Sequence, residues 1–491
     1  MLKPEDIKRL IEEDYLSDKK KQARTGIRYY DGVHDIRDYR LFYFNEHGDL
    51  VEDKYRTNIK ISHPFFTEIV DQAVQYILSG KDGFVRSDNP DLQKELDAYF
   101  NENEDFRAEL YETLTGCMVK GYEYMYAYKT TEGRVAFQCA DAMGIIEVKA
   151  SETDSECEYV IFWYVEGVTK ERKPITRIEV WDKTQTTYFV RDENGEILKD
   201  KSKPENPRPH MAYKKGKGSK VFYDVFGFIP FFRLDNNRKQ TSDLRPIKAL
   251  IDDYDLMACG LSNNIQDTNE ALYVVSGYDG DNLDELTHNI KVKKHVGVGE
   301  GGGVEIRTID IPVEARKTKM ELDEQNIYRF GQAMNTYGLK DTTATTNLAI
   351  KSAYSLLDLK ANKLEIRLKQ FMRKLLRVVL EEINARNKTD YKQSDVYFRF
   401  EREVPTNAQE NAQVELLEAQ RRQAEITTLL NLASNLDNET MMKLICEQLD
   451  IDYEEVKDKL PDPATADPYS TDAAITAVRE VPTDETGGGA E

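Results

Sequence analysis

The chain has 491 residues, 40% of them hydrophobic and 32% charged, and a formal net charge of −21. This length predicts three or four domains, and so acidic a chain is not expected to bind DNA or an anionic membrane over its whole surface. The five cysteines are scattered and include no C-x-x-C pair, which indicates a reducing compartment and disfavours a disulfide framework or a zinc site. No apolar run approaches the ~20 residues of a membrane span, and the charged N-terminal segment is not a signal-peptide pattern. We therefore expect synthesis in a cytoplasm.

The first 120 residues are predicted to be mainly helical. An amphipathic helix is expected from Pro4 to about Arg28, followed by a short extended piece near 41–43. A second helix is expected from Pro64 to Leu78, because its apolar positions recur at four-residue steps. A third is expected from Asp105 to Lys120.

From Gly121 the pattern changes to short aromatic and β-branched runs separated by turn residues. This alternation predicts a meander of antiparallel strands. Asp192–Gly195 is predicted to form a hairpin turn within it. Residues 199–220 are basic and rich in Pro and Gly, and are predicted to be a loop.

Two long helices of matched length are predicted next, at Pro246–Thr268 and Pro312–Thr336, each about 35 Å long. Between them, strand, short helix and strand follow one another at 271–277, 282–289 and 304–311. The economical arrangement is an antiparallel helix pair with a compact α+β insert at its far tip.

The remainder of the chain alternates between polar and strongly helical segments. Residues 337–347 are rich in threonine and predict a flexible loop, and a very long helix with a leucine-rich side follows at 348–386. One strand is expected at 395–403. Residues 405–459 read as helical, and the acidic tail 461–491 is predicted to be disordered.

Several residues could carry chemistry, but simpler roles also fit them. Asp252 and Asp255 share a helix face, as i, i+3 pairs do, and suggest either a metal-dependent nuclease or a solvated or inter-subunit helix face, which we favour. Gly297–Gly303 lacks the Lys-Ser/Thr of a phosphate-binding loop and is predicted to be a hairpin-like loop. Lys214–Lys220 could contact nucleic acid, but a short charged run is usually a solvated loop, and we favour that interpretation. None of the histidines pairs at metal-ligand spacing, so no enzyme, cofactor or metal is expected; they are His34, His47, His63, His210, His288 and His295.

Five segments closely resemble the portal-protein family of long-tailed phages that infect Gram-positive bacteria. The most specific is GFIPFFRLDNNRKQTSDLRPIKALIDDYD, and the family commonly has Gly at the position of Leu348. The five segments are Tyr29–Ile36, Asn58–Gly80, Gly121–Asp141, Gly227–Asp255 and Asn347–Glu365.

The resemblance implies a multi-domain α+β portal fold that assembles into a ring of twelve subunits. It implies the following regions: wing 1–242, first stem helix 243–268, clip 269–311, second stem helix 312–336, tunnel loop 337–347, long tunnel helix and returning wing strand 348–404, helical crown 405–460, and acidic tail 461–491. Twelve helices of ~10 Å width side by side leave roughly 28 Å open, enough for one DNA duplex. An acidic ring resists sticking to DNA, because DNA affinity depends on neutralising phosphates with Lys and Arg.

The implied function is a channel at one capsid vertex through which double-stranded DNA is packaged and ejected, with weak, sequence-independent DNA contact. Implied partners are the terminase large subunit, scaffolding protein, major capsid protein and head-completion adaptor, with the protein in the host cytoplasm during assembly and then in the virion. The clip is expected to dock the motor and adaptor through Leu272, Tyr273 and Val274. The DNA-facing loop residues are expected to be Gly338, Lys340, Asp341, Thr342, Thr343, Thr345, Thr346 and Asn347. The alternative is a non-portal head or tail adaptor.

Overall fold

The structure, a computed structural model, forms two compact bodies, Met1–Pro405 and Thr406–Glu491, each described by itself. It describes residues 2–54, 56–151, 154, 156–168, 174–192, 194–203, 205–214, 221–268, 272–278, 282–290, 296–307, 311–335, 347–403, 408–431, 440, 443, 444 and 446.

The N-terminal region is helical, as predicted, but its first helix is broken. It forms α1 (Pro4–Leu16) and α2 (Asp18–Tyr30), because Ser17 adopts an extended conformation and its hydroxyl accepts a hydrogen bond from Lys20 N–H. Such a side chain caps a new helix instead of continuing the old one. The helices that follow are α3 (Phe65–Ile77), α4 (Pro90–Leu96) and α5 (Glu104–Lys120). Short turns lie at Asp35–Asp38, Asp97–Asn101, Ala142–Gly144 and Gln393–Asp395.

The predicted meander is confirmed as two antiparallel sheets. One has the order β14–β4–β5 and the other β10–β9–β8–β7–β6, with β11 beside β9. The predicted turn connects β9 and β10, with Gly195 at a φ of 82°. The strands are β4 (Tyr122–Lys129), β5 (Val135–Ala140), β6 (Ile145–Val148), β7 (Tyr159–Val168), β8 (Pro174–Trp181), β9 (Gln185–Arg191), β10 (Ile197–Lys199), β11 (Arg208–Pro209) and β14 (Phe231–Asp235).

The basic segment 199–220 contains strands, contrary to the prediction of a loop. β12 (Met211–Lys214) pairs with β13 (Val221–Asp224). Tyr213 stacks on Phe222 across the pair, so aromatic cross-strand contact overrides the local turn signal. Residues 215–220, most of the basic run, lie outside the described residues.

The predicted long helix is confirmed as α9 (Asn347–Asn387), and its apolar side enters the main hydrophobic core. Leu368, Phe371 and Leu375 are almost completely buried there, on a helix that packs against α3 and β14. The returning strand is only β17 (Tyr397–Phe398), which pairs with β3 (Val85–Arg86). Its predicted length was too great, because only two residues find a partner strand.

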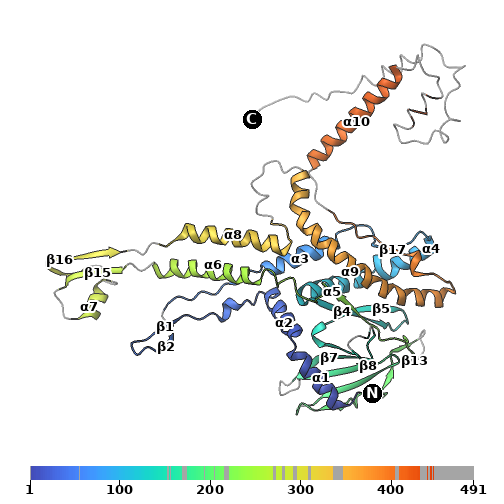
Figure 1. Cartoon of the computed structure of the whole chain (residues 1–491), viewed down its shortest axis with the longest axis horizontal. Coiled ribbons are helices and arrows are strands. Elements are labelled where there is room, and N and C mark those ends of the chain that lie inside the picture. Colours follow the sequence, from blue (N-terminus) through green and yellow to red (C-terminus); the bar gives the residue numbers. More distant parts are fainter. Residues whose placement is uncertain are drawn as a thin grey trace, which may run out of the picture. The chain divides into compact units, whose positions relative to one another are not determined.

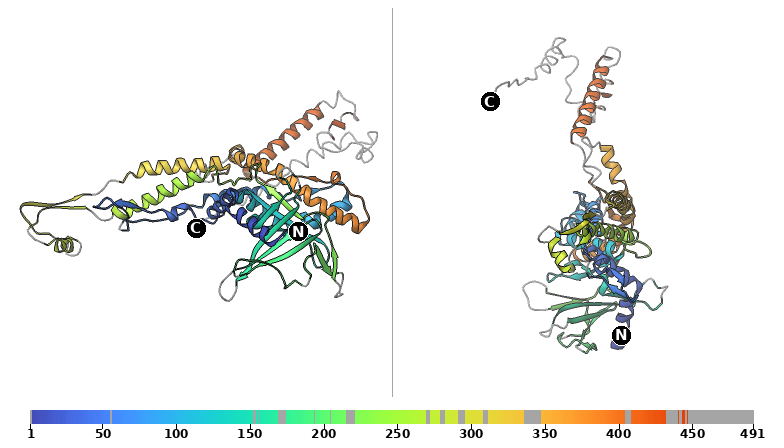
Figure 2. Two further views of the ribbon diagram at one scale, coloured as in Figure 1. Left: turned by 60° about the horizontal axis from the view of Figure 1, so that its bottom comes forward. Right: turned by 90° about the vertical axis from the view of Figure 1, so that its left-hand side faces the viewer.

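Two long helices leave this core side by side (Figures 1 and 2). They are α6 (Lys248–Thr268) and α8 (Val313–Gly331). Along the chain, β15 (Leu272–Tyr278), α7 (Leu283–His288) and β16 (Val298–Arg307) separate them, and Figure 1 shows this module beyond the tips of both helices. The helix–insert–helix order is therefore confirmed.

The glycine-rich run 297–303 corrects one prediction, since most of it is part of β16. Gly303 pairs with Ser276 and Val298 with Tyr278, across an irregularity in the register. Glycines fit such an irregularity because they adopt conformations that other residues avoid, and Gly301 has a φ of 84°.

A small hairpin, β1 (Phe42–Phe44) with β2 (Leu50–Glu52), extends beside α6 (Figure 1). The sequence predicted an extended piece here but not its partner strand. In the second body, α10 (Ala408–Asn431) confirms a helix at the start of the predicted helical region.

Candidate functional site

Charged side chains hold α6 and α8 together. Lys319 on α8 forms ion pairs with Asp253 on α6 and with Asp323 one turn further along α8. Burial lowers the Lys319 pKa, but the hydrogen bonds to these two carboxylates outweigh it and raise the pKa above the ordinary lysine value.

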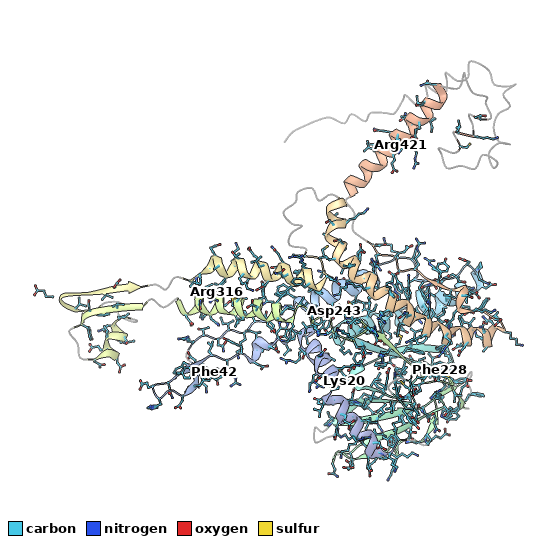
Figure 3. All side chains as sticks on the ribbon, viewed as in Figure 1. Lys20, Phe42, Phe228, Asp243, Arg316 and Arg421 are labelled. Atoms are coloured by element: carbon cyan, nitrogen blue, oxygen red, sulfur yellow. The ribbon has the colours of Figure 1, made fainter. Side chains whose placement is uncertain are left out.

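Arg316 of α8 crosses to α6 at a glycine. A Cβ at Gly260 would lie 2.5 Å from the Arg316 guanidinium, and that guanidinium donates to Met257 O at 3.5 Å. Figure 3 shows Arg316 on the helix pair. The two helices thus approach closely where a side chain is absent.

The base of α6 carries a buried carboxylate that contacts two imidazoles. The Asp255 side chain is fully buried, with His34 Nδ1 at 2.6 Å and His63 Nδ1 at 2.7 Å, and it also accepts a bond from His63 N–H at 3.0 Å. Burial alone would raise the Asp255 pKa, but the bonds from His34 and His63 outweigh burial and lower it below its ordinary value. The carboxylate is therefore ionised and accepts a hydrogen bond from each ring.

Asp252, one turn earlier, also has internal partners. It accepts a hydrogen bond from the Tyr29 hydroxyl, and Lys248 Nζ lies 2.7 Å from Asp252 and 2.6 Å from Asp35. Asp252 and Asp255 do share a helix face, as predicted. For Asp255, however, the interpretation as a solvated or inter-subunit face is wrong, because the N-terminal segment covers it.

Residues 57–63 lie along α6 and form a ladder of hydrogen bonds with it. Alternate backbone N–H groups of this extended segment donate to side chains spaced four apart on the helix. The rungs are His63 to Asp255 (3.0 Å), Ile61 to Cys259 (3.2 Å), Ile59 to Asn263 (2.7 Å) and Thr57 to Asp267 (3.4 Å). We call this the 57–63 ladder; it fixes an irregular segment onto a helix face.

The end of α8 is fixed onto α3. Tyr328 donates to Glu68 at 2.6 Å, and the Gln72 side-chain amide bonds both the N–H and the C=O of Met334, at 3.1 and 3.2 Å. Gln332 takes a left-handed conformation with a φ of 55°. This helix was predicted to reach Thr336; it ends at Gly331 because α3 offers the next residues hydrogen bonds that a helix would not allow.

The N-terminal half of α9 is fixed to the same place. Lys360 is buried, donates to Gly331 O at 3.2 Å and lies 2.8 Å from Asp243, just before α6. A positive side chain at the C-terminus of α8 satisfies a carbonyl that has no partner within the helix. One lysine thus joins α8, α9 and the start of α6.

The returning segment after α9 contributes a further attachment. Arg402 forms an ion pair with Glu365 and donates to Asn362 at 2.8 Å, while Tyr76 donates to Asp358 at 2.6 Å. Both sides of the segment 336–346 therefore end on one anchored framework, formed by α3, α8 and α9.

Of the expected loop residues, only Asn347 is described: it is the first residue of α9. Gly338, Lys340, Asp341, Thr342, Thr343, Thr345 and Thr346 lie outside the described residues. Leu272, Tyr273 and Val274 open β15 and pair with Arg307, Ile306 and Glu305 of β16, with Val274 40% exposed.

Sequence reasoning missed Gln72, Lys360 and the two histidines on Asp255. A usable signal existed for the ladder, since Asp255, Cys259, Asn263 and Asp267 recur every four residues on one helix face. Within the described ranges, no group of three or more His, Cys, Asp or Glu side chains could hold a metal ion. Across those same ranges, no helix is both long and apolar enough to cross a membrane.

Comparison with known proteins gives a consistent result. A family model described as phage portal protein, SPP1 Gp6-like, matches residues 11–454. The portal protein of Bacillus phage SPP1 is 30% identical over 370 residues, which cover 74% of this chain and 71% of that protein. The portal protein of Clostridium phage phiCD119 is 29% identical over 197 residues, which cover 38% and 42%. This chain therefore belongs to the SPP1 Gp6-like phage portal protein family, whose members are structural proteins of the phage virion and not enzymes.

Proposed function

We propose that twelve copies of this chain form a ring at one capsid vertex, and that double-stranded DNA enters and leaves through its centre. The observation that carries this proposal is the α6–α8 pair with the small β15–α7–β16 module beyond its tips. In the ring this pair is the stem, the β15–α7–β16 module is the clip, and residues 1–242 together with α9 and β17 are the wing. Residues 405–460 are the crown.

Electron microscopy of the purified protein tests the ring directly. We expect closed, turbine-like rings with a central hole wide enough for one duplex. Particles without a hole, or a stable monomer at micromolar concentration, would argue instead for a head or tail adaptor. A nuclease assay with Mg²⁺ or Mn²⁺ should show no cleavage, since Asp252 and Asp255 are engaged by internal partners.

The loop 337–347 is proposed as the narrowest part of the channel. What supports this is the anchoring on both sides: Gln72 holds Met334 on α3, and Lys360 joins α9 to Gly331. A loop between two fixed ends can project into a channel without moving its supports. Changing Lys340 to Glu should leave ring assembly intact but alter packaging or retention of DNA. If Lys340→Glu and deletion of Thr342–Thr345 both leave packaging unchanged, the loop neither grips nor gates the DNA.

The clip is proposed to bind the terminase large subunit during packaging and the head-completion adaptor afterwards. The clip follows α6 and precedes α8 in the chain, and it lies beyond the ends of both helices, where partners can reach it. Polar substitution of Leu272, Tyr273 or Val274 should block packaging or tail joining in an infection assay. Normal packaging and tail joining by such variants would exclude this docking surface. Scaffolding protein and major capsid protein are proposed to contact other parts of the ring.

The ring is proposed to touch DNA weakly and without sequence preference, because each copy carries a formal charge of −21. Filter binding across a salt series should show little retention of duplex DNA at physiological salt. Tight binding with a steep salt dependence would contradict this proposal.

A further inference from the structure

The β1–β2 hairpin exposes an unusual amount of apolar surface for two short strands. Phe42, Phe44 and Leu50 are 54%, 73% and 61% exposed, and Tyr43 and Val51 are 40% and 37% exposed. Phe44 is the cross-strand partner of Leu50, and Tyr43 is the partner of Val51. Since neighbouring residues of a strand point to opposite sides, both faces of the hairpin are apolar and exposed.

The hairpin is held in place despite its exposure. The 57–63 ladder fixes the chain that leaves β2 to the side of α6, and Asn58 and Lys60 donate to the backbone of Tyr39 and Arg37 at 3.3 and 3.0 Å. In Figure 3, Phe42 lies on a projection beside α6, away from the sheets of the main body. A firmly attached projection with apolar faces is a preorganised contact surface, because little ordering remains to oppose binding.

We propose that this hairpin binds the adjacent copy of the same chain, a contact that depends on the proposed ring. Closing a ring of identical subunits requires each copy to present two different surfaces, one to each neighbour. The hairpin is a suitable first surface because the ladder places it beside α6, and α6 belongs to the stem, which the ring proposal places next to the neighbour's stem.

The net charge determines which kind of surface can join two copies. Neighbouring copies, each with a formal charge of −21, repel one another, so their association must come mainly from buried apolar area. The hairpin offers that area on both faces. On α8, Leu322 is 50% exposed and gives a neighbour's hairpin an apolar residue to contact.

The first test compares two double variants of the full chain. The hairpin variant is Phe44→Ser with Leu50→Ser, and the control is Leu16→Ser with Leu198→Ser, two similarly exposed leucines on α1 and β10 (64% and 54%). Native mass spectrometry and sedimentation should show the fraction of ring falling at least tenfold in the hairpin variant and staying unchanged in the control. Circular dichroism should be unchanged in both. A hairpin variant that forms rings as the wild type does would overturn the proposal.

The second test does not depend on how a variant folds. A photo-reactive benzoyl-phenylalanine at Phe44 should, in the wild-type background, crosslink to a second copy, seen as a covalent dimer on a denaturing gel. Crosslinks only within the same chain, or only to major capsid or scaffolding protein in infected cells, would overturn the proposal. A wild-type chain that never forms rings would instead contradict the proposed function, which is a separate outcome.

Discussion

The proposed wing, which is the part of the chain that contains the main hydrophobic core, and the α6–α8 pair are held together in different ways. The wing buries large apolar side chains such as Phe66, Phe100 and Phe371 in one core, whereas α6 and α8 meet through Lys319 and its carboxylates and through Arg316. Apolar packing fills space tightly and resists small displacements. Exposed ion pairs contribute little and are screened by salt. The wing is therefore expected to be the rigid part of each subunit and the helix pair the adjustable part.

The largest effect is expected from opening the wing core. Phe371→Ala should reduce the free energy of unfolding by about 3–5 kcal/mol, because it removes a fully buried ring and leaves a cavity. Leu359→Ala on the same helix, where the side chain is 48% exposed, should have a much smaller effect. Chemical denaturation of both variants measures the difference. Equal losses would mean that the apolar side of α9 does not define the wing core.

A smaller effect is expected at the junction of the two regions. Asp255→Asn should cost about 1–3 kcal/mol, since it removes a buried charge that accepts hydrogen bonds from two imidazoles. The folded-state pKa of Asp255 is lowered, so its contribution is complete above the unfolded-state pKa, near 3.9, and is lost as the pH falls through the folded-state pKa. The stability difference between wild type and variant should therefore shrink below about pH 4.

The control for this junction is Asp267→Asn, at the weakest rung of the 57–63 ladder. It should change stability by only a few tenths of a kcal/mol and show no comparable pH dependence. If Asp255→Asn were equally mild, α6 would not be fastened to the wing through His34 and His63.

The smallest effect is expected between the helices themselves. Lys319→Met should change the free energy of unfolding by no more than about 1 kcal/mol, because Lys319 is 43% exposed. The change should diminish further in 1 M salt, while that of Phe371→Ala should not. Thermal melting at low and high salt measures both. A large, salt-independent loss for Lys319→Met would contradict the view that the helix pair is loosely held.

The elements that sequence patterns predicted well are those whose signals are local. The leucine period of α9 and the start signals of α6 and α8 depend on neighbouring residues alone. The same reasoning could have found the break at Ser17, which is a cap residue with its partner at Lys20. Local patterns could not have predicted that α8 ends at Gly331, because the cause is Gln72 on α3, some 260 positions earlier in the chain.

In the candidate site, too, local features could be predicted from the sequence and contacts between distant residues could not. Loop composition marked 337–347 as special, and the shared face of Asp252 and Asp255 followed from helix geometry. The partners of Asp255 were beyond reach, since His34 and His63 stand near the N-terminus and carry no spacing signal relative to α6. The β1–β2 hairpin was half predicted, because strand pairing across a turn is harder to see than a single extended run.

The 57–63 ladder joins an extended chain and a helix, which differ in rise per residue. Two residues of extended chain advance about 6.6 Å, whereas four residues of helix advance about 6.0 Å, so each step between rungs adds about 0.6 Å of mismatch. Over the three steps between the four rungs the two lengths come to differ by about 1.8 Å, and the bond at Thr57 is the longest, at 3.4 Å. The backbone N–H donors and the side-chain acceptors therefore stay in register over only a short stretch. Such a mismatch limits how many bonds of this kind a regular helix and a regular extended chain can share, and beyond the rung at Thr57 the chain leads to the hairpin.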